Sequence, residues 1–217
     1  MANMFLQRSH PIFIQMSGAP GSGKSTLAKL LGREIDGVVI DHDLFKSSLL
    51  EDDAISFDQA GKVAYRLDWV VAEGMMEQGR SVILDSTCNF QQIVNTGRAL
   101  AQKYGYTYWY VECKVNDIGL LDERLRTRAP LRSQRTGVDC PPRDSNGNPT
   151  GEDSRALFKK WIENPCRPDD NIIFVDPTCS PEEGRDAVLN RILAATAAKE
   201  DNLATATPCF LEGGSVA

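Results

Sequence analysis

The chain has 217 residues, of which 41% are hydrophobic and 25% charged, and its formal net charge is −6. This composition predicts a packed globular domain and disfavours extensive nucleic-acid binding, because proteins that coat a duplex usually carry a basic excess. No apolar run approaches the ~20 residues of a membrane span, and the N-terminus lacks a charged-then-apolar secretory signal. We therefore expect a cytoplasmic protein without a membrane partner.

Strand-like and helix-like patterns alternate along the chain. Short apolar runs predict strands at residues 11–17, 37–41, 80–85, 106–113 and 171–176. Several are almost continuously hydrophobic, as in strands buried on both faces of a parallel sheet. Helical patterns occupy residues 24–35, 57–78, 90–104, 116–127, 154–163 and 181–198. The sequence therefore predicts an α/β fold: a doubly wound, mainly parallel five-stranded sheet with helices on both faces.

The longest predicted helix, at residues 57–78, has apolar residues at the spacing of one helix face. We expect this stripe to face the core. It consists of Phe57, Ala60, Val63, Ala64, Leu67, Val70, Val71, Gly74 and Met75.

Two segments interrupt the alternation. Residues 129–152 are rich in Pro, Gly, Asn and charge, which predicts a long mobile loop. Residues 200–217 have the composition of a flexible C-terminal tail. We therefore expect a single domain over residues 1–199, with a lid or insertion at about 124–165.

The stretch GAPGSGKST fits the phosphate-binding pattern G-x-x-x-x-G-K-[ST], and it lies between a predicted strand and a predicted helix. Its glycines let backbone N–H groups converge on phosphate oxygens, and the helix N-terminus adds positive potential. We expect Lys24 to reach the β- and γ-phosphates and Ser25 to ligate Mg²⁺. The residues predicted to bind the nucleotide are Gly18, Ala19, Pro20, Gly21, Ser22, Gly23, Lys24, Ser25 and Thr26.

Two carboxylates, Asp41 and Asp43, lie at the end of the second predicted strand. The carboxyl ends of parallel strands line the ligand crevice, and in extended chain these two side chains point to the same side. One carboxylate would orient the hydration shell of Mg²⁺, and the other would accept a proton from an attacking hydroxyl. The structural alternative is that Asp43 caps a helix that starts at LFKSSLL.

The third predicted strand ends at Asp85, where a carboxylate would approach Mg²⁺. Ser86, Thr87 and Asn89 add short hydrogen-bonding groups at the same edge. The alternative is again helix capping, with Asn89 at the start of the next helix.

Five arginines lie between residues 124 and 135, and two of them, Arg124 and Arg128, are spaced for one helix face. The planar guanidinium group suits phosphate oxygens and charge that develops in a transition state. A loop that carries such residues would close over a nucleotide and exclude water. The alternative is a solvated basic face.

The ordered set GAPGSGKST, DHDLFK, VILDSTCNF and ERLRTR resembles the P-loop kinases that include the 5′-hydroxyl polynucleotide kinases, the zeta-toxin-like kinases and antibiotic phosphotransferases. The resemblance covers residues 12 to about 128. It departs from the polynucleotide kinases at Lys46, where those enzymes have an arginine, and in the acidic net charge. Both departures favour a small acceptor over a nucleic-acid end.

The resemblance implies roles for individual residues. Asp43 is similar to the general base of these kinases, and Lys46 to the residue that helps to hold the acceptor. The DxD pattern also resembles shikimate-type kinases, in which the first aspartate, here Asp41, lies near Mg²⁺. The family has an aspartate at the end of its third strand, followed by a threonine or serine, and these correspond to Asp85 and Ser86. Its lid arginines correspond to Arg124 and Arg128.

These observations predict an ATP- and Mg²⁺-dependent kinase that transfers the γ-phosphate to a hydroxyl of a small molecule. A 5′-hydroxyl RNA or DNA end is the alternative acceptor, and a nucleotide-dependent switch or ATPase is the alternative class. The expected catalytic residues are Lys24, Asp43, Arg124 and Arg128. The expected metal ligands are Ser25, Asp41 and Asp85, and the expected acceptor-binding residues are Asp43, Lys46, Ser86 and Thr87.

Overall fold

The computed structural model describes residues 11–145, 153–176 and 178–205 of the chain. Within these residues, strands form one sheet in the order β2-β3-β1-β4-β5, and every neighbouring pair is parallel. The strands are β1 (Ile12–Ser17), β2 (Val38–Asp41), β3 (Val82–Asp85), β4 (Thr107–Cys113) and β5 (Ile172–Val175). The predicted five-stranded parallel sheet is confirmed.

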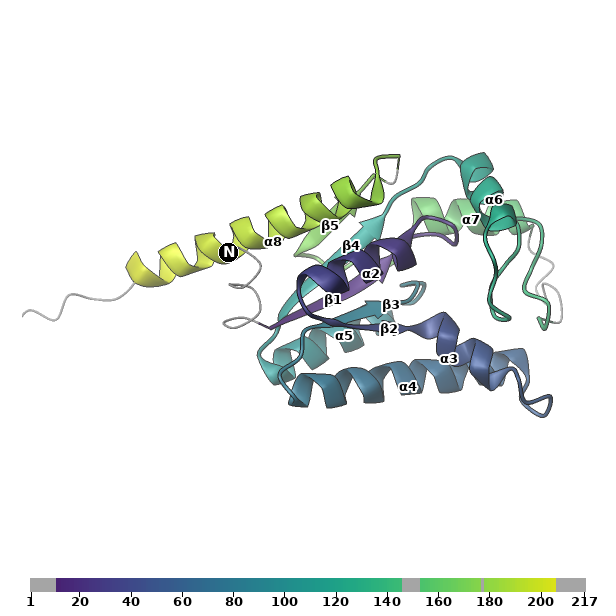
Figure 1. Ribbon diagram of the computed structural model, residues 1–217, viewed down its shortest axis with the longest axis horizontal. Coiled ribbons are helices and arrows are strands. Elements are labelled where there is room, and N and C mark those ends of the chain that lie inside the picture. The colour runs from purple at the N-terminus through teal and green to yellow at the C-terminus, as the bar shows by residue number, and fades with distance from the viewer. Residues whose placement is uncertain (1–10, 146–152, 177, 206–217) are drawn as a thin grey trace, which may run out of the picture.

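Helices cover both faces of this sheet (Figure 1). One face carries α2 (Lys24–Glu34) and α8 (Pro181–Thr205), and the other carries α4 (Phe57–Glu77) and α5 (Gln91–Tyr104). Strand β1 contributes to both cores, because successive side chains of a strand point to opposite faces. Ile14 packs in the core with α2 and α8, and Phe13 packs in the core with α4 and α5.

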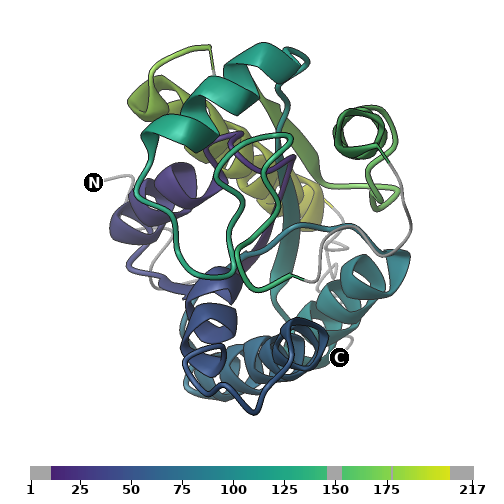
Figure 2. The same cartoon turned by 90° about the vertical axis from the view of Figure 1, so that its right-hand side faces the viewer.

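Three further helices lie toward the carboxyl end of the sheet. They are α3 (His42–Leu49), α6 (Ile118–Thr127) and α7 (Ser154–Glu163). Helices α6 and α7 share a small apolar cluster with Ala19, which includes Leu121, Leu125 and Phe158. The segment of chain that follows α6 and precedes α7 runs across this end of the sheet toward α3 (Figure 2). The fold therefore brings α3 and the segment after α6 together beside the loop between β1 and α2.

The buried face of α4 differs from the predicted apolar stripe. The buried residues are Ala60, Ala64, Asp68, Ala72 and Met76. In contrast, Val63, Leu67 and Val70 of the predicted stripe are 37%, 36% and 67% exposed. Small alanines face the sheet because they let α4 approach it closely, and Asp68 lies in the same face because it has a buried partner, described below. The predicted stripe is therefore right in part, since Ala60 and Ala64 are buried and Val71 and Met75 pack against the core, but Val63, Leu67 and Val70 point away from it.

Three other expectations about the chain change. Helix α3 begins directly after β2, at His42, whereas a helix here was only the alternative interpretation and was expected to start after Asp43. Helix α8 continues to Thr205 rather than ending near residue 198, so the first residues of the predicted tail are helical. Within the predicted mobile loop, Ser133 and Gln134 make hydrogen bonds with α3, whereas residues 146–152 and 206–217 lie outside the described residues. Among the residues that the structure describes, no helix is long and apolar enough to cross a membrane.

Candidate active site

The loop between β1 and α2 has the backbone of a phosphate-binding loop. Gly18, Gly21 and Gly23 adopt positive φ angles of 128°, 86° and 93°. At Gly18 a side chain is also excluded by space, because a Cβ atom would collide with the carbonyl oxygen of Cys113. Helix α2 starts at Lys24 without a side-chain cap on its first N–H groups. Those N–H groups are therefore available to an anion at the positive end of the helix.

Lys24 lies beneath this loop and is buried. Its Nζ donates hydrogen bonds to the carbonyl oxygens of Gly18, at 2.9 Å, and Ala19, at 3.0 Å. Burial lowers the pKa of Lys24 from its ordinary value, while the carboxylate of Asp85 acts in the opposite direction. Since an ammonium group has three N–H donors, one donor remains for a phosphate oxygen.

Two acidic strand ends meet beside Lys24. Asp41 and Asp85 are paired residues at the ends of β2 and β3. Asp85 is 4% exposed, and its Oδ2 has no hydrogen-bond partner among the described residues. Burial raises the pKa of Asp85 to about 6, against the opposing effects of Ser25 and Lys24. Burial and the neighbouring carboxylate of Asp43 also raise the pKa of Asp41.

This edge fits a hydrated divalent cation that binds together with a nucleotide. A buried carboxylate oxygen without a partner needs a ligand, and carboxylate and hydroxyl oxygens are the donors that Mg²⁺ prefers. In the described part of the chain, no group of three or more His, Cys, Asp or Glu side chains could hold a metal ion by itself. Phosphate oxygens and water would therefore have to complete the coordination shell of an ion held by Ser25, Asp41 and Asp85.

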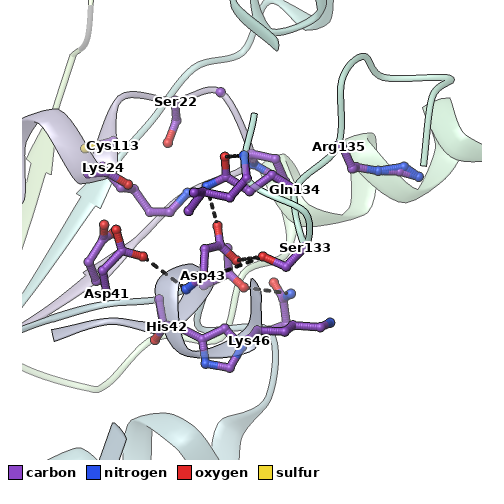
Figure 3. Close-up of a pocket in the computed structure, with 18 of the residues that line it drawn as sticks. Ser22, Lys24, Asp41, His42, Asp43, Lys46, Cys113, Ser133, Gln134 and Arg135 are labelled. Carbon is purple, nitrogen blue, oxygen red and sulfur yellow. Dashed lines mark hydrogen bonds between the residues drawn. The ribbon is translucent and has the colours of Figure 1, made fainter. Parts of the chain in front are cut away.

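Asp41, rather than Asp43, is the N-cap residue of α3. Its Oδ1 accepts a hydrogen bond of 3.0 Å from the backbone N–H of Asp43. The chain thus turns into the helix at His42, and the expectation that both carboxylates share an extended segment is wrong. Asp43 instead lies in the first turn of α3, with its carboxylate in the cleft (Figure 3). Similarly, the N-cap residue of α5 is Phe90 and not Asn89.

The carboxylate of Asp43 is held by the segment after α6, which the sequence did not predict. Gln134 Nε2 donates a hydrogen bond of 2.7 Å to Asp43 Oδ2 (Figure 3). Ser133 Oγ lies 3.2 Å from the backbone oxygen of Asp43 and 3.4 Å from its Oδ1. Ser133 in turn pairs with Ser47 of α3, and both serines are buried. No local pattern marks these residues, because they contact α3 from about 90 positions away.

The predicted lid arginines are not on one helix face. Helix α6 ends at Thr127, and Arg128 is its C-cap residue in an extended conformation. The Arg128 guanidinium donates a hydrogen bond of 3.1 Å to the carbonyl oxygen of Arg135, and its buried Nε has no partner among the described residues. Burial lowers the pKa of Arg128, and Asp43 opposes that shift. Arg124, Arg128 and Arg135 nevertheless all line the same cleft.

The cleft has a volume of about 1720 Å³, which exceeds the roughly 300–1,000 Å³ of single-ligand pockets. It therefore has room for a nucleotide and a second ligand. Nearly all predicted site residues line it; only Gly18 and Ala19 do not, because they turn the chain beneath it. The residues that do so are Pro20, Gly21, Ser22, Gly23, Lys24, Ser25, Thr26, Asp41, Asp43, Lys46, Asp85, Ser86, Thr87, Arg124 and Arg128.

Beyond Asp43, the cleft has a wall of aromatic and basic side chains from α3 and α4. The Lys46 ammonium lies 3.4 Å from the centroid of the Phe57 ring, and burial lowers the pKa of Lys46. Tyr65 and Trp69 line the same region. Such a surface suits the apolar face of a ligand together with hydrogen-bonding or anionic groups.

A buried histidine–aspartate pair supports this wall and was missed by the sequence analysis. His42 Nδ1 lies 2.7 Å from Asp68 Oδ2, and both residues are buried. Burial raises the pKa of Asp68, against the effect of His42, and the His42 ring packs on Tyr65 with centroids 4.1 Å apart. One signal for this pair is present in the sequence. Asp68 is a charged residue on a face of α4 whose other buried residues are all apolar.

A glycine-bearing phosphate loop, a buried lysine and acidic ends of neighbouring parallel strands define a nucleoside-triphosphate-binding protein of the P-loop class. A family model described as an AAA domain matches residues 13–140, and the chain belongs to this family. P-loop kinases generally use a nucleotide and a divalent metal ion. A comparison with curated protein sequences found no significant match.

Solved structures of kinases share this fold. A candidate kinase from Chloroflexus aurantiacus is 20% identical with a TM-score of 0.62, and the match covers 92% of this chain and 100% of that one. A gluconokinase from Sinorhizobium meliloti is 15% identical with a TM-score of 0.56 and the same coverage of both chains. The APS kinase of Mycobacterium tuberculosis, in complex with AMPPNP and APS, is 18% identical with a TM-score of 0.55, over 83% of this chain and 96% of that one. The fold is that of the P-loop kinases.

Proposed function

We propose that this protein is an ATP- and Mg²⁺-dependent kinase that transfers the γ-phosphate to a hydroxyl group of a small molecule. The observation that carries this proposal is the position of Asp43. Its carboxylate lies in the same cleft as the phosphate loop, in the first turn of a helix that starts directly after β2. A nucleotide-dependent switch needs no carboxylate there, whereas a kinase needs a group that can accept the proton of its acceptor.

The nucleotide would bind along the β1–α2 loop. Backbone N–H groups at the start of α2 would hold the phosphate oxygens, and the remaining N–H of Lys24 would bind an oxygen of the β- or γ-phosphate. Ser25, Asp41 and Asp85 would hold Mg²⁺, which neutralises charge on the β- and γ-phosphates when it is bound. Arg128 faces the same space and can bind charge that develops on the transferred group.

The transfer step then uses Asp43. The acceptor oxygen forms a bond to the γ-phosphorus while the bond from that phosphorus to the β–γ bridging oxygen breaks. The hydroxyl proton passes to the Asp43 carboxylate, and ADP leaves with the electron pair of the broken bond. A carboxylate suits this role because phosphoryl transfer depends more on positioning than on a strong base.

Four observations support a small acceptor. The segment after α6 lies directly on Asp43, which limits the space around the base. The wall beyond Asp43 combines Lys46 with aromatic rings, which suits a compact ligand that has both an apolar face and polar groups. The net charge of −6 does not suit a protein that binds a long polyanion. Gluconokinase and APS kinase, which share the fold, are named for small molecules.

The test is an incubation of the protein with ATP, Mg²⁺ and a metabolite extract, followed by mass spectrometry of phosphorylated products. Asp43→Asn should form none of the products that the wild type forms. Asp36→Asn is the matched control, because Asp36 is an exposed aspartate whose positive φ angle of 48° suits asparagine. Products confined to an added 5′-hydroxyl oligonucleotide would replace the small acceptor by a nucleic-acid end. ATP hydrolysis without any phosphorylated product would contradict the kinase.

A further inference from the structure

We infer that Gln134 is a positioning residue that fixes the carboxylate of Asp43 and makes Oδ1 the atom that accepts the proton. The inference rests on the proposed function, in which Asp43 is the base. It adds a residue from a segment, Leu131–Arg135, that carries no recognisable motif.

The orientation of the Gln134 amide is determined by its two partners. Its Oε1 accepts a hydrogen bond of 3.2 Å from the backbone N–H of Leu131. Its Nε2 donates the 2.7 Å bond to Asp43 Oδ2. The reverse orientation would place the NH₂ group against an N–H and the amide oxygen against a carboxylate oxygen, so both contacts would become repulsive. The donor to Asp43 is therefore unambiguous.

The segment that carries Gln134 is anchored to α3 by a reciprocal serine pair. The backbone N–H of Ser133 donates to Ser47 Oγ at 3.0 Å, and the Ser47 hydroxyl donates back to Ser133 Oγ at 2.9 Å. This leaves the Ser133 hydroxyl proton for the backbone oxygen of Asp43, at 3.2 Å. Because both serines are buried, these bonds are protected from exchange with water and hold Gln134 in register with Asp43.

The other side of the segment is tied to α6. Arg128 donates to the carbonyl oxygen of Arg135, and the backbone N–H of Val138 donates to Asp122 Oδ1 at 2.7 Å. One short stretch thus connects the base on α3 with the guanidinium that faces the phosphate site. Figure 3 shows Gln134 above the Asp43 carboxylate, Ser133 to its right and Lys24 to its upper left.

The two oxygens of Asp43 consequently differ. Oδ2 accepts the short, charge-assisted bond from Gln134, whereas the approach of Ser133 to Oδ1 is long, at 3.4 Å. Oδ1 is therefore the less strongly bonded oxygen, and the one better able to receive the acceptor proton. Without Gln134 the carboxylate can rotate about its χ2 angle, and the base spends less time aimed at the acceptor. A misplacement of this kind lowers the rate of the chemical step on the order of 10²-fold.

The test compares Gln134→Ala, Gln134→Glu and the control Gln78→Ala, an exposed glutamine at the end of α4. Initial rates of formation of the wild-type product are measured at pH 8 with varied ATP. We expect kcat to fall about 10²-fold in Gln134→Ala with KM for ATP unchanged, which also shows that the variant is folded. Gln134→Glu should be no better, although it has the same shape, because a carboxylate at pH 8 has no proton to donate to Asp43.

Wild-type turnover in Gln134→Ala, or rescue by Gln134→Glu, would overturn the inference while leaving the kinase intact. A loss of kcat accompanied by an equal loss of ATP binding would also overturn it, since that result indicates a structural role. Absence of any product from the wild-type protein would instead overturn the proposed function itself. The outcomes for the two proposals are therefore separate.

Discussion

Asp41 and Asp85 lie directly opposite each other as the last paired residues of β2 and β3. The parallel register alone places two carboxylates at one edge of the sheet, next to Lys24 and Ser25. Since burial disfavours two negative charges at such short range, this edge gains stability when a cation or a proton binds. The arrangement leads to a prediction about pH.

Asp85→Asn should stabilise the free protein at neutral pH. The pKa of Asp85 is about 6 in the folded state, against an ordinary value of 3.8, so the folded state binds more protons between these values and loses stability as the pH rises through them. At roughly 1.4 kcal/mol per pKa unit, this cost amounts to about 3 kcal/mol above pH 6. The free energy of unfolding, measured by urea denaturation at pH 4, 5, 6 and 7, should fall less with rising pH in the variant than in the wild type. If the free energy of unfolding changed with pH by the same amount in both proteins, the raised pKa of Asp85 would be contradicted.

Lys24→Met should weaken nucleotide binding, and it also removes the two bonds from Nζ to the loop carbonyls of Gly18 and Ala19. The substitution removes the donor that remains for a phosphate oxygen, and a hydrogen bond to a charged group contributes about 1.5–3 kcal/mol, or roughly 10- to 150-fold in affinity. Calorimetric titration with ATP and Mg²⁺ measures the loss. Lys159→Met, on the exposed face of α7, is the matched control. Equal affinity in the two variants would show that Lys24 has only a structural role.

Gly18→Ala should abolish nucleotide binding and destabilise the protein, because the position combines a φ angle of 128° with a collision against Cys113. Gly74→Ala is the opposite case. It lies within α4, and a Cβ atom there would have no neighbour within 4 Å. The second variant should gain up to about 1 kcal/mol from helix propensity. Thermal unfolding should show a lower Tm for Gly18→Ala and a higher Tm for Gly74→Ala than for the wild type. A Gly18→Ala protein as stable as the wild type would contradict the account of the loop.

The His42–Asp68 pair should behave as a unit. Asp68→Ala leaves the buried His42 ring without its hydrogen-bond partner, which typically costs about 1–3 kcal/mol, whereas replacing both partners by apolar groups costs less. A double-mutant cycle with His42→Phe and Asp68→Ala, followed by urea unfolding, measures the coupling. Additive effects would show that the two side chains contribute independently.

The sequence was sufficient to predict the sheet, because buried parallel strands are apolar along their length and their ends are polar. The predicted strands therefore agree with the observed ones, and their carboxyl ends carry Asp41 and Asp85 as expected. The start of α3 was misplaced because no turn residue separates this helix from β2. Asp41 both ends the strand and caps the helix.

The rest of the site depends on contacts between distant segments. Gln134 and Ser133 reach Asp43 across about 90 residues from a segment whose composition indicates only a loop. Asp68 occupies the buried face of α4, and only the position of His42 on another helix explains it. Periodicity cannot reveal such residues, because their burial is determined by tertiary partners rather than by neighbours in the sequence.

The most direct test of the account is a side-by-side measurement of ATP affinity and phosphoryl transfer in the wild type and Asp43→Asn, with the acceptor isolated from the extract. We expect ATP to bind both proteins with the same Kd, because Asp43 lies beyond the phosphate loop. We expect kcat to fall about 10²- to 10⁴-fold in the variant, as for the loss of a general base. Transfer by Asp43→Asn at the wild-type rate would contradict the central claim.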